Sequence, residues 1–400
     1  MEWNKLTENL SQSDISPAGP WLYGVNPGVY RITDADALAH ARDAAAAQGR
    51  DSLRILAPSS MGDALAAFRP VADTPDGLLL EMPLTADCPL LPLRMHPAYR
   101  HGEMTPWGGD QLRRVFGKNI PDDRTGEAME LSVIPGLESV TDNGQTLSDL
   151  IAREPRVTGL PAGETFPLLL KLLAAKGSLS VQVHPDDAYA ATNEGKLGKT
   201  EAWVILEAEE NASILYGIKE GVSLAQLEAG LLSGADIEPL IARVPARPGD
   251  VFFMPAGMVH AIGGGILLYE IQQSSDVTYR LWDFNRTNDK GEKRPLHIRQ
   301  SIDVIRPELK GQTAQMPTAL DDHLHSLLQV PAFRLDCAAV ATRVTLPPCG
   351  TFRILTVLDP LTLSWQGGSL NLIPGCTVFL PAAGPELTLS GKGRALLSGC

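Results

Sequence analysis

Short apolar runs separated by glycine, proline and aspartate recur along most of the chain. Apolar runs of strand length between turn residues are typical of a β-barrel or β-sandwich. Strands are expected at 131–134, 166–173, 179–183, 202–206, 214–216, 251–254 and 266–271, and again at 333–335, 343–346, 352–358, 361–365, 377–380 and 395–397. The pattern therefore predicts a mainly β protein.

Helical spacing interrupts this β pattern near the middle of the chain. Leu224, Leu227 and Leu231 would share one side of a helix over 223–232, because positions three or four apart meet on a helix face. A second helical segment is expected at 237–242. We interpret the two together as a short helical insert within a β domain.

The first 87 residues have a different pattern and predict a small α/β extension. Thr33 would cap an alanine-rich helix over 34–48. A short strand is expected at 53–56 and a helical turn at 63–68. Catalytic residue types do not gather there at a telling spacing, so the role of the extension stays open.

One sequence block occurs twice. Residues 248–256 (PGDVFFMPA) align with residues 374–382 (PGCTVFLPA), and a gapped extension of this alignment places 177–184 over 350–357. Two copies of one β unit are the simplest explanation of such a repeat.

The repeat and the change of pattern near residue 88 divide the chain into three parts. We expect an extension at 1–87, a β domain at 88–315 with its helical insert at about 221–243, and a second β domain at 316–400. The 37 glycines and 31 prolines agree with a chain of many turns.

Charge and cysteine content narrow the classes of partner and location. The chain has 34 Lys+Arg against 47 Asp+Glu, and its net charge of −13 argues against nucleic acid and anionic membranes, which attract clustered positive charge. Five cysteines without a CxxC pair indicate isolated thiols in a reducing compartment. The first residues lack the basic and apolar regions of a signal peptide. We expect a soluble, cytoplasmic protein.

One long segment without charged side chains, 251–269, nears the length of a membrane-spanning helix. It contains Pro255, four glycines and His260, and it is bounded by Asp250 and Glu270. We therefore interpret it as buried strands joined by a turn.

Four polar residues in the first β domain are candidates for one metal site. Gln182 and His184 are two apart in a predicted strand and so share a face. Glu201 begins the next apolar run, where a buried carboxylate needs a partner, either a metal or the nearby Lys199. His260 lies in the turn between two long apolar runs. Together these side chains supply the nitrogen and oxygen ligands that zinc, iron or manganese accept.

Taken singly, each candidate is also explained as a hydrogen-bonded core or surface residue. The second copy of the β unit aligns Leu355, Val357 and Glu386 with three of the four positions and so lacks the ligand set. The sequence therefore predicts one metal ion per chain.

Three cationic residues are further candidates. Arg280 is either a surface residue or, beside a metal-lined cavity, a group that holds a phosphate or a developing oxyanion. Lys171 and Lys176 lie in and just after an apolar run, and they either line the same cavity or extend to the surface.

An ordered series of motifs resembles type I mannose-6-phosphate isomerases. The matching blocks are 107–109 (WGG), 116–118 (FGK), 126–130 (GEAME), 179–187 (LSVQVHPDD), 198–203 (GKTEAW), 248–261 (PGDVFFMPAGMVHA), 270–276 (EIQQSSD) and 279–280 (YR). The resemblance spans about 91–396. It implies a double cupin, that is, two β-barrel or jelly-roll units, and it leaves the N-terminal extension unexplained.

The resemblance also implies a chemistry and a ligand set. One zinc ion would be held by Gln182, His184, Glu201 and His260. The implied reaction is the interconversion of mannose 6-phosphate and fructose 6-phosphate through a cis-enediol or enediolate. Arg280 is implied to be catalytic.

The remaining roles are less determined by the sequence. Lys199 is implied to lie at the active site, and the proton-transfer base is Lys199, a zinc-bound water or Glu270. Lys176, Ser180 and Arg280 are candidate donors to the substrate phosphate.

Two other functions stay open at this point. Two histidines and a carboxylate also describe non-haem iron oxygenases, although a fourth ligand would leave fewer positions for oxygen and substrate. A metal-stabilised sugar-phosphate-binding or regulatory protein without turnover is the non-enzymatic alternative. The sequence leaves the oligomeric state open between monomer and homodimer.

Overall fold

The computed structural model describes residues 15–17, 23–25, 29–32, 37–38, 41, 52–58, 69–74, 77–83, 90–288, 290–382 and 384–400. Strands dominate these ranges and form five sheets, which confirms the prediction of a mainly β protein. No helix in the described ranges is long and apolar enough to cross a membrane.

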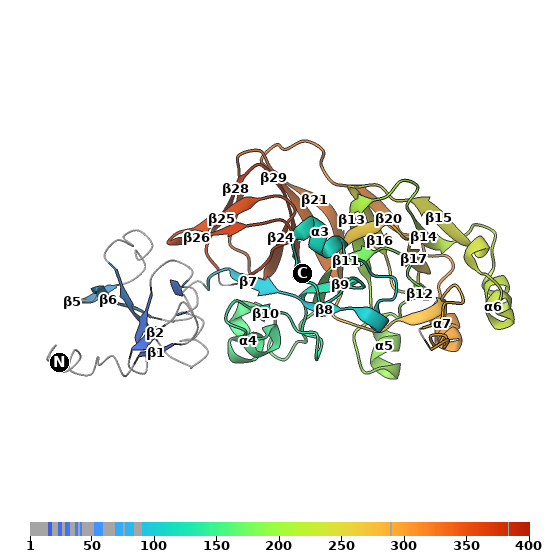
Figure 1. Cartoon of the computed structure of the whole chain (residues 1–400), viewed down its shortest axis with the longest axis horizontal. Helices are drawn as coiled ribbons and strands as arrows, with labels where there is room; N and C mark the ends of the chain where they lie inside the picture. The colour runs from blue at the N-terminus through green and yellow to red at the C-terminus, as the bar shows by residue number, and fades with distance from the viewer. Residues whose placement is uncertain are drawn as a thin grey trace.

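A six-stranded sheet lies in the N-terminal extension, at the blue end of the chain in Figure 1. Its strands in spatial order are β1 (Ile15–Pro17), β2 (Tyr23–Val25), β3 (Val29–Arg31), β4 (Ser52–Ala57), β6 (Gly77–Pro83) and β5 (Arg69–Thr74). Residues 37, 38 and 41 are helical, as expected for a helix within 34–48. Strand β4 contains the strand expected at 53–56, and the turn expected at 63–68 lies outside the described residues.

The first barrel consists of a seven-stranded and a five-stranded sheet. The larger sheet contains, in spatial order, β20 (Gln312–Gln315), β16 (Asp250–Met254), β13 (Glu201–Ala208), β18 (Ile266–Gln273), β11 (Leu168–Ala175), β9 (Glu127–Leu131) and β8 (Ala98–Arg100). The smaller sheet contains β15 (Ile241–Pro245), β14 (Ser213–Ile218), β17 (His260–Ile262), β12 (Val181–Val183) and β19 (Tyr279–Trp282). Buried side chains such as Trp203, Phe252 and Leu268 form one core within this barrel.

The second barrel repeats this plan with one seven-stranded and one four-stranded sheet. The larger sheet contains β10 (Val140–Thr141), β7 (Leu93–His96), β27 (Thr377–Leu380), β24 (Arg353–Val357), β29 (Gly393–Gly399), β22 (Phe333–Val340) and β21 (His323–Val330). The smaller sheet contains β23 (Arg343–Leu346), β28 (Leu387–Gly391), β25 (Leu361–Trp365) and β26 (Gly368–Leu372). Strands β7 and β10 come from the segment before residue 316, yet they pair within the large sheet of the second barrel. The proposed domain boundaries stay a prediction.

The two large sheets pack against each other through one continuous apolar core. Tyr269 of the first barrel and Phe333 of the second belong to the same buried cluster. The rings of Phe352 and Phe379 stack at 5.7 Å, and Phe166 lies 4.7 Å from Phe352. Alternation along each strand sends one set of side chains into this seam and the other into its own barrel. Figure 1 shows the two barrels side by side.

Short helices surround the barrels. They are α3 (Gln111–Phe116), α4 (Leu147–Arg153), α5 (Asp187–Asn193), α6 (Leu224–Ser233) and α7 (Ile298–Val304), with 3-10 turns at η3 (Gly102–Met104), η4 (Pro155–Val157) and η5 (Glu238–Leu240). Helix α6 confirms the helix expected at 223–232. It begins with a capping box between Ser223 and Gln226 and ends at Gly234 in the left-handed conformation.

Two expected elements were wrong. The helix expected at 237–242 is a 3-10 turn followed by strand β15, whose Ile241 pairs with Ile218 of β14. The strand expected at 131–134 lies earlier, at β9. Strand β9 contains buried Glu127 and Glu130, so an apolar pattern does not reveal it.

The sheet orders correct the gapped half of the repeat alignment. The order β20-β16-β13-β18-β11-β9 in the first barrel corresponds to β7-β27-β24-β29-β22-β21 in the second. Strands β16 and β27 correspond, as the PGD and PGC blocks predict. Strand β24, however, corresponds to β13, whereas β12 corresponds to β23 in the smaller sheet. The placement of 177–184 over 350–357 is therefore wrong.

Candidate metal centre and active site

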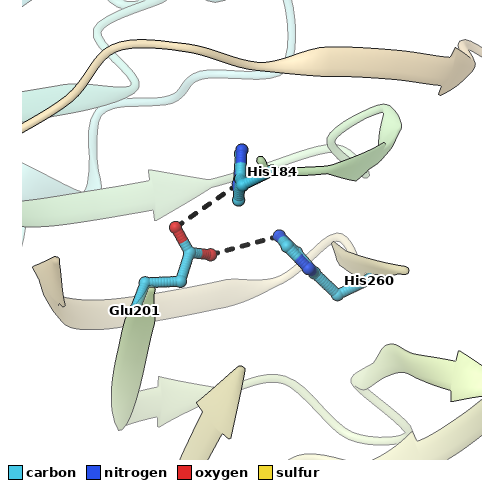
Figure 2. Close-up of side chains that lie close together, drawn as sticks. All are labelled: His184, Glu201 and His260. Atoms are coloured by element: carbon cyan, nitrogen blue, oxygen red, sulfur yellow. Dashed lines mark ion pairs between the residues drawn. The ribbon is translucent and has the colours of Figure 1, made fainter. Parts of the chain in front are cut away.

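Three of the four predicted metal ligands meet inside the first barrel. Glu201 is the first residue of β13, His260 is the first residue of β17, and His184 directly follows β12. All three are at most 1% exposed. Glu201 Oε2 lies 3.5 Å from His184 Nε2, and Glu201 Oε1 lies 3.1 Å from His260 Nε2. Figure 2 shows the carboxylate of Glu201 reaching between the two rings.

Backbone carbonyl groups orient both histidines. The Nδ1 atom of His184 lies 2.9 Å from the carbonyl oxygen of Val277, and Nδ1 of His260 lies 2.8 Å from that of Met258. A carbonyl oxygen only accepts, so each Nδ1 carries the proton and each Nε2 carries a lone pair. The lone pairs of both rings therefore face Glu201, as metal-binding histidines require.

The donor set has the properties of a divalent-metal site. One nitrogen or oxygen from each of the three residues lies within 4.8 Å of the others, and no other His/Cys/Asp/Glu group among the described residues meets this condition. Glu201 Oε1 and His260 Nε2 are buried and have no hydrogen-bond partner in the described structure. Two acceptors 3.1 Å apart without a donor are stabilised by a cation between them.

Gln182, the fourth predicted ligand, lies in strand β12 between His260 and Arg280. Its Cα is paired with that of His260 on one side and with that of Arg280 on the other. Directly paired residues of antiparallel strands present their side chains on the same face. The half-buried Gln182 side chain thus shares the face of the smaller sheet that carries His260.

Lys199 is part of the same buried cluster. Its Nζ donates to His184 Nε2 at 3.0 Å and forms an ion pair with Glu201 Oε2. Burial alone raises the pKa of Glu201, but Lys199 and the two histidines outweigh it and hold this pKa well below its usual value. Burial, followed by the charge of Lys199, lowers the pKa of His184 well below its ordinary value. His184 is thus held in the neutral form that binds metal.

Gln272 is a buried polar residue of this site that sequence reasoning missed. It is fully buried, and its Cα is paired with that of Glu201 across β18 and β13. Its Nε2 donates to the Ser275 carbonyl at 2.6 Å, while its Oε1 has no partner in the described structure. Gln272 lies two residues after the candidate Glu270 in one strand and so shares its face, which is the signal that could have identified it.

A buried ion network extends deeper into the barrel. Lys171 Nζ lies 2.8 Å from Glu270 Oε1 and 3.6 Å from Glu127 Oε1. Trp203 Nε1 donates to the second oxygen of Glu270 at 3.0 Å. Although burial opposes the charge, Glu127 and Glu270 together raise the pKa of Lys171. Lys171 thus lines the barrel interior, one of the two positions left open by the sequence.

Arg280 stands at the edge of the smaller sheet next to Gln182. Its Nε donates to Ser180 Oγ at 3.2 Å, and its Nη1 donates to the Pro295 carbonyl at 2.8 Å. Predicted substrate residues Ser180 and Arg280 are therefore in contact, whereas Lys176 is exposed in the turn after β11.

Two further arginines flank Arg280 and share one carboxylate. Arg286 and Arg294 each contact Asp283 Oδ1 at 2.5 Å, and Arg286 Nη1 also donates to the Ser178 carbonyl at 2.5 Å. Burial, followed by the charge of Arg294, lowers the pKa of Arg280. Three arginines around one aspartate give this side of the site excess positive charge, which the sequence alone did not reveal.

The second barrel has different residues at the corresponding positions. Arg353 is paired with Leu380 just as Glu201 is paired with Met254. Arg353 therefore occupies the position of Glu201. The earlier alignment of Leu355 with Gln182 was wrong, because β24 corresponds to β13 and not to β12.

One of the other two aligned positions also changes. His184 follows β12, which corresponds to β23, so Val357 of β24 is not its counterpart. Strand β28, which corresponds to β17, begins at Leu387, one residue after Glu386.

Comparison with known proteins identifies related sequences. A family model described as "Phosphomannose isomerase type I, catalytic domain" matches residues 93–210. "Probable mannose-6-phosphate isomerase GmuF" of Bacillus subtilis is 35% identical over 315 residues, which cover 77% of this chain and 98% of that protein. A mannose-6-phosphate isomerase of Streptococcus mutans is 47% identical over 203 residues, which cover 50% of this chain and 64% of that protein.

Solved structures agree with these relatives. The crystal structure of mannose 6-phosphate isomerase from Bacillus subtilis superposes with a TM-score of 0.71 at 33% identity, covering 78% of this chain and 100% of that one. "The structure of a putative mannosephosphate isomerase from Archaeoglobus fulgidus", 22% identical with a TM-score of 0.61, supports the fold alone. Phosphomannose isomerases are cupins, so the predicted double cupin is confirmed.

Proposed function

The chain belongs to the type I phosphomannose isomerase family, and on that premise we propose that it interconverts mannose 6-phosphate and fructose 6-phosphate. The observation that carries the proposal is the buried His184, Glu201 and His260 cluster with Lys199 and Arg280 beside it. An aldose–ketose isomerase needs a group that polarises the substrate oxygens and a group that moves a proton between neighbouring carbons. This cluster contains candidates for both.

The proposed metal is one zinc ion per chain, held by His184, Glu201 and His260 with Gln182 as a fourth ligand. The orphaned acceptors at Glu201 Oε1 and His260 Nε2 support a bound cation, and the imidazole and carboxylate donors suit zinc. When bound, zinc supplies Lewis acidity that polarises the substrate oxygens.

Lys199 is proposed to carry the proton. In the aldose-to-ketose direction, a base removes the proton from C2, and the C2–H electron pair becomes the double bond of an enediolate. The proton returns at C1, while the hydroxyl proton of O2 moves to O1. Lys199 is preferred to Glu270 because its Nζ lies within the cluster itself, against Glu201 and His184, whereas the oxygens of Glu270 contact Lys171 and Trp203. In its neutral form Lys199 would take up the C2 proton and return it at C1.

Arg280 is proposed to stabilise the negative charge that develops on the enediolate oxygen. Its guanidinium is fixed by Ser180 and Pro295 before substrate arrives, so little reorganisation is needed during the reaction. Arg280 and Ser180, with Lys176 at the exposed turn, are also the proposed contacts of the substrate phosphate. The excess positive charge of Arg286 and Arg294 supports an anion on this side.

Glu270 is proposed to bind substrate through the network at the base of the site. One sugar hydroxyl would donate to its carboxylate in place of the Trp203 or Lys171 hydrogen bond. We also propose a cytoplasmic location, because the isolated cysteines of the sequence indicate a reducing compartment.

The test is a conversion assay on the zinc-loaded protein. Fructose 6-phosphate is supplied, and mannose 6-phosphate is measured before and after chelation of the metal. We expect conversion that stops on chelation and returns when zinc is added back. Metal bound at one equivalent without conversion would contradict the isomerase and favour a binding or regulatory protein. Oxygen consumption with iron instead would favour the oxygenase.

A further inference from the structure

Arg280 lies in β19, the outermost strand of the five-stranded sheet. On its inner side β19 pairs with β12, and the residue opposite Arg280 is Gln182. The backbone N–H and C=O of Arg280 both point to the open edge, where they bond to the segment before α7. In antiparallel pairs this orientation brings the facing side chains closest together. The outer edge of β19 therefore helps to decide where the guanidinium lies.

His297 closes this edge with two reciprocal hydrogen bonds. Its backbone N–H donates to the Arg280 carbonyl at 2.8 Å, and its ring Nδ1 accepts the Arg280 N–H at 3.1 Å. The imidazole thus takes the place that a backbone carbonyl of another strand would have. Pro295, two residues earlier, accepts Arg280 Nη1 at 2.8 Å. The short segment 295–297 therefore forms hydrogen bonds with both the backbone and the guanidinium of Arg280.

The segment is anchored by α7. His297 precedes the first residue of this helix, and its carbonyl accepts from the N–H of Ser301 at 2.9 Å and from Ser301 Oγ at 2.7 Å. The backbone of His297 is therefore fixed by α7. Of its contacts with Arg280, only the hydrogen bond from the Arg280 N–H to the ring Nδ1 depends on the protonation state of the ring.

We propose that His297 is a positioning residue for Arg280, and that protonation of its ring releases the Arg280 backbone and lowers turnover on the acid side of neutrality. The inference rests on the proposed catalytic role of Arg280. Accepting a hydrogen bond at Nδ1 requires the neutral ring with its proton on Nε2. Protonation places an N–H at Nδ1 against the Arg280 N–H, and it adds a positive charge next to a guanidinium.

The groups around His297 set the direction of its titration. The ring is partly buried and faces the Arg280 cation of β19, and its centroid lies 6.2 Å from that of Tyr279. Glu194, which follows α5, is the facing acid and accepts from Tyr279 Oη at 2.7 Å. Burial, and then Arg280, lower the pKa of His297 against the opposing effect of Glu194. The ring is thus neutral when Arg280 is held.

The test compares two substitutions of His297 over about pH 5.5 to pH 8.5. His297→Asn keeps a short side-chain oxygen that can accept the Arg280 N–H but does not titrate, whereas His297→Ala removes the acceptor. His323→Asn is the control, because His323 is 74% exposed on β21, far along the chain from the site. Zinc-loaded, full-length enzyme is used, and zinc content is measured at each pH so that metal loss is separated from positioning.

We expect kcat of the wild type and of His323→Asn to fall on the acid side with the same midpoint, below about pH 6.5. The same kcat fall should be absent in His297→Asn, which should keep kcat within about threefold at pH 8. His297→Ala should lose about three- to tenfold in kcat at pH 8 while it keeps zinc, and this loss relative to the wild type should shrink on the acid side, where the wild-type ring no longer accepts the Arg280 N–H. An unchanged acid limb in His297→Asn, or wild-type kcat in His297→Ala, would overturn the proposal. If His297→Ala does not fold, His297→Asn alone decides.

A second readout does not depend on turnover. Imidazole nitrogen NMR of the zinc-loaded protein, with the signal assigned by its loss in His297→Asn, should show at about pH 7.5 an unprotonated Nδ1 and a protonated Nε2. A protonated Nδ1 would contradict the inference. If the wild type does not isomerise at all, the proposed function fails, and the NMR result still decides whether His297 holds Arg280 as described.

Discussion

The two barrels share one strand order but differ at a few inward-facing positions. In the first barrel, Glu201, Glu270 and Gln272 bring charge and hydrogen-bonding groups into the interior. The strand registers place Arg353, Leu397 and Gly399 at the corresponding positions of the second barrel. The interior of the second barrel is filled by an apolar cluster of leucines, valines and alanines.

The difference shows how chemistry is added to a fold. Trp203 and Lys171, which both bond to Glu270, correspond to Leu355 and Asp336 in the second barrel. With Leu397 in the place of Glu270, that ion network has no counterpart there. The frame of paired strands persists with either set of side chains, because backbone hydrogen bonds and the shared apolar seam hold it. The proposed activity therefore depends on a few residues at one end of one barrel.

The largest effect is expected from the metal ligands. His260→Ala or Gln182→Leu should remove both zinc and turnover, with a loss beyond the roughly 100-fold that follows removal of an outer partner of a metal ligand. Elemental analysis and the conversion assay on the same preparation check this. Full zinc and turnover in His260→Ala would remove His260 from the ligand set.

Arg280→Ala should separate metal binding from turnover. We expect kcat to fall by about 100- to 1000-fold, as for the loss of a donor to a developing oxyanion, while zinc stays at the wild-type level. Arg353→Ala, at the Glu201 position of the second barrel, is the matched control and should leave kcat unchanged. An Arg280→Ala enzyme with wild-type turnover would end the proposed catalytic role.

The buried ion network predicts a stability difference between two lysines. Lys171→Met should lower the free energy of unfolding by about 3–5 kcal/mol, because it leaves Glu270 buried without its cation and Glu127 with Arg100 alone. Lys176→Met, on the exposed turn, should change it by less than about 0.5 kcal/mol. Denaturant unfolding of both variants at neutral pH makes the comparison, and equal effects would contradict a buried role for Lys171.

The same network predicts a pH dependence of stability. Burial raises the pKa of Glu127, but Lys171 and Arg100 outweigh it and hold it below its usual value. Glu127 therefore stabilises the fold above the pKa it has when unfolded, and this contribution is lost as the pH falls through its folded pKa. In Lys171→Met we expect a shallower slope, because Glu127 then keeps only the Arg100 cation and Glu270 loses its lysine. Unfolding measured over about pH 3 to pH 7 distinguishes the two slopes.

The smallest effect on turnover is expected in the second barrel. Leu363→Ala, in its fully buried apolar cluster, should cost about 2–5 kcal/mol of stability. Its kcat, measured where the protein is folded, should match the wild type. A large loss of kcat with zinc retained would show that the second barrel contributes to catalysis as well as to stability.

The sequence brought forward the residues of the buried His184, Glu201 and His260 cluster because they stand out. Gln182 and His184 are polar at alternate positions of an apolar strand, and Glu201 opens another, so pattern alone brings them forward. Their meeting with His260 is a matter of sheet pairing, which the motif resemblance implied and local sequence does not reveal.

The missed features depend on long-range partners. Glu127 and Glu130 break the apolar pattern of β9, yet both are buried because Lys171 and Lys118 neutralise them. The repeat was correct at its PGD and PGC turns, where glycine at positive φ marks the register (Gly249 and Gly375). The gapped extension of the alignment, 177–184 over 350–357, was wrong, because apolar strands have similar sequences and their register is set by strand pairing.

The most direct test of the account is the position of zinc. Crystals of the zinc-loaded protein measured at the zinc absorption edge should show one anomalous peak per chain, about 2.0–2.2 Å from His184 Nε2, His260 Nε2 and a Glu201 oxygen. The peak should vanish in Glu201→Ala and persist in Arg353→Ala. A peak at the Arg353 end of the second barrel, or a peak that survives in Glu201→Ala, would contradict the assignment of the chemistry to the first barrel.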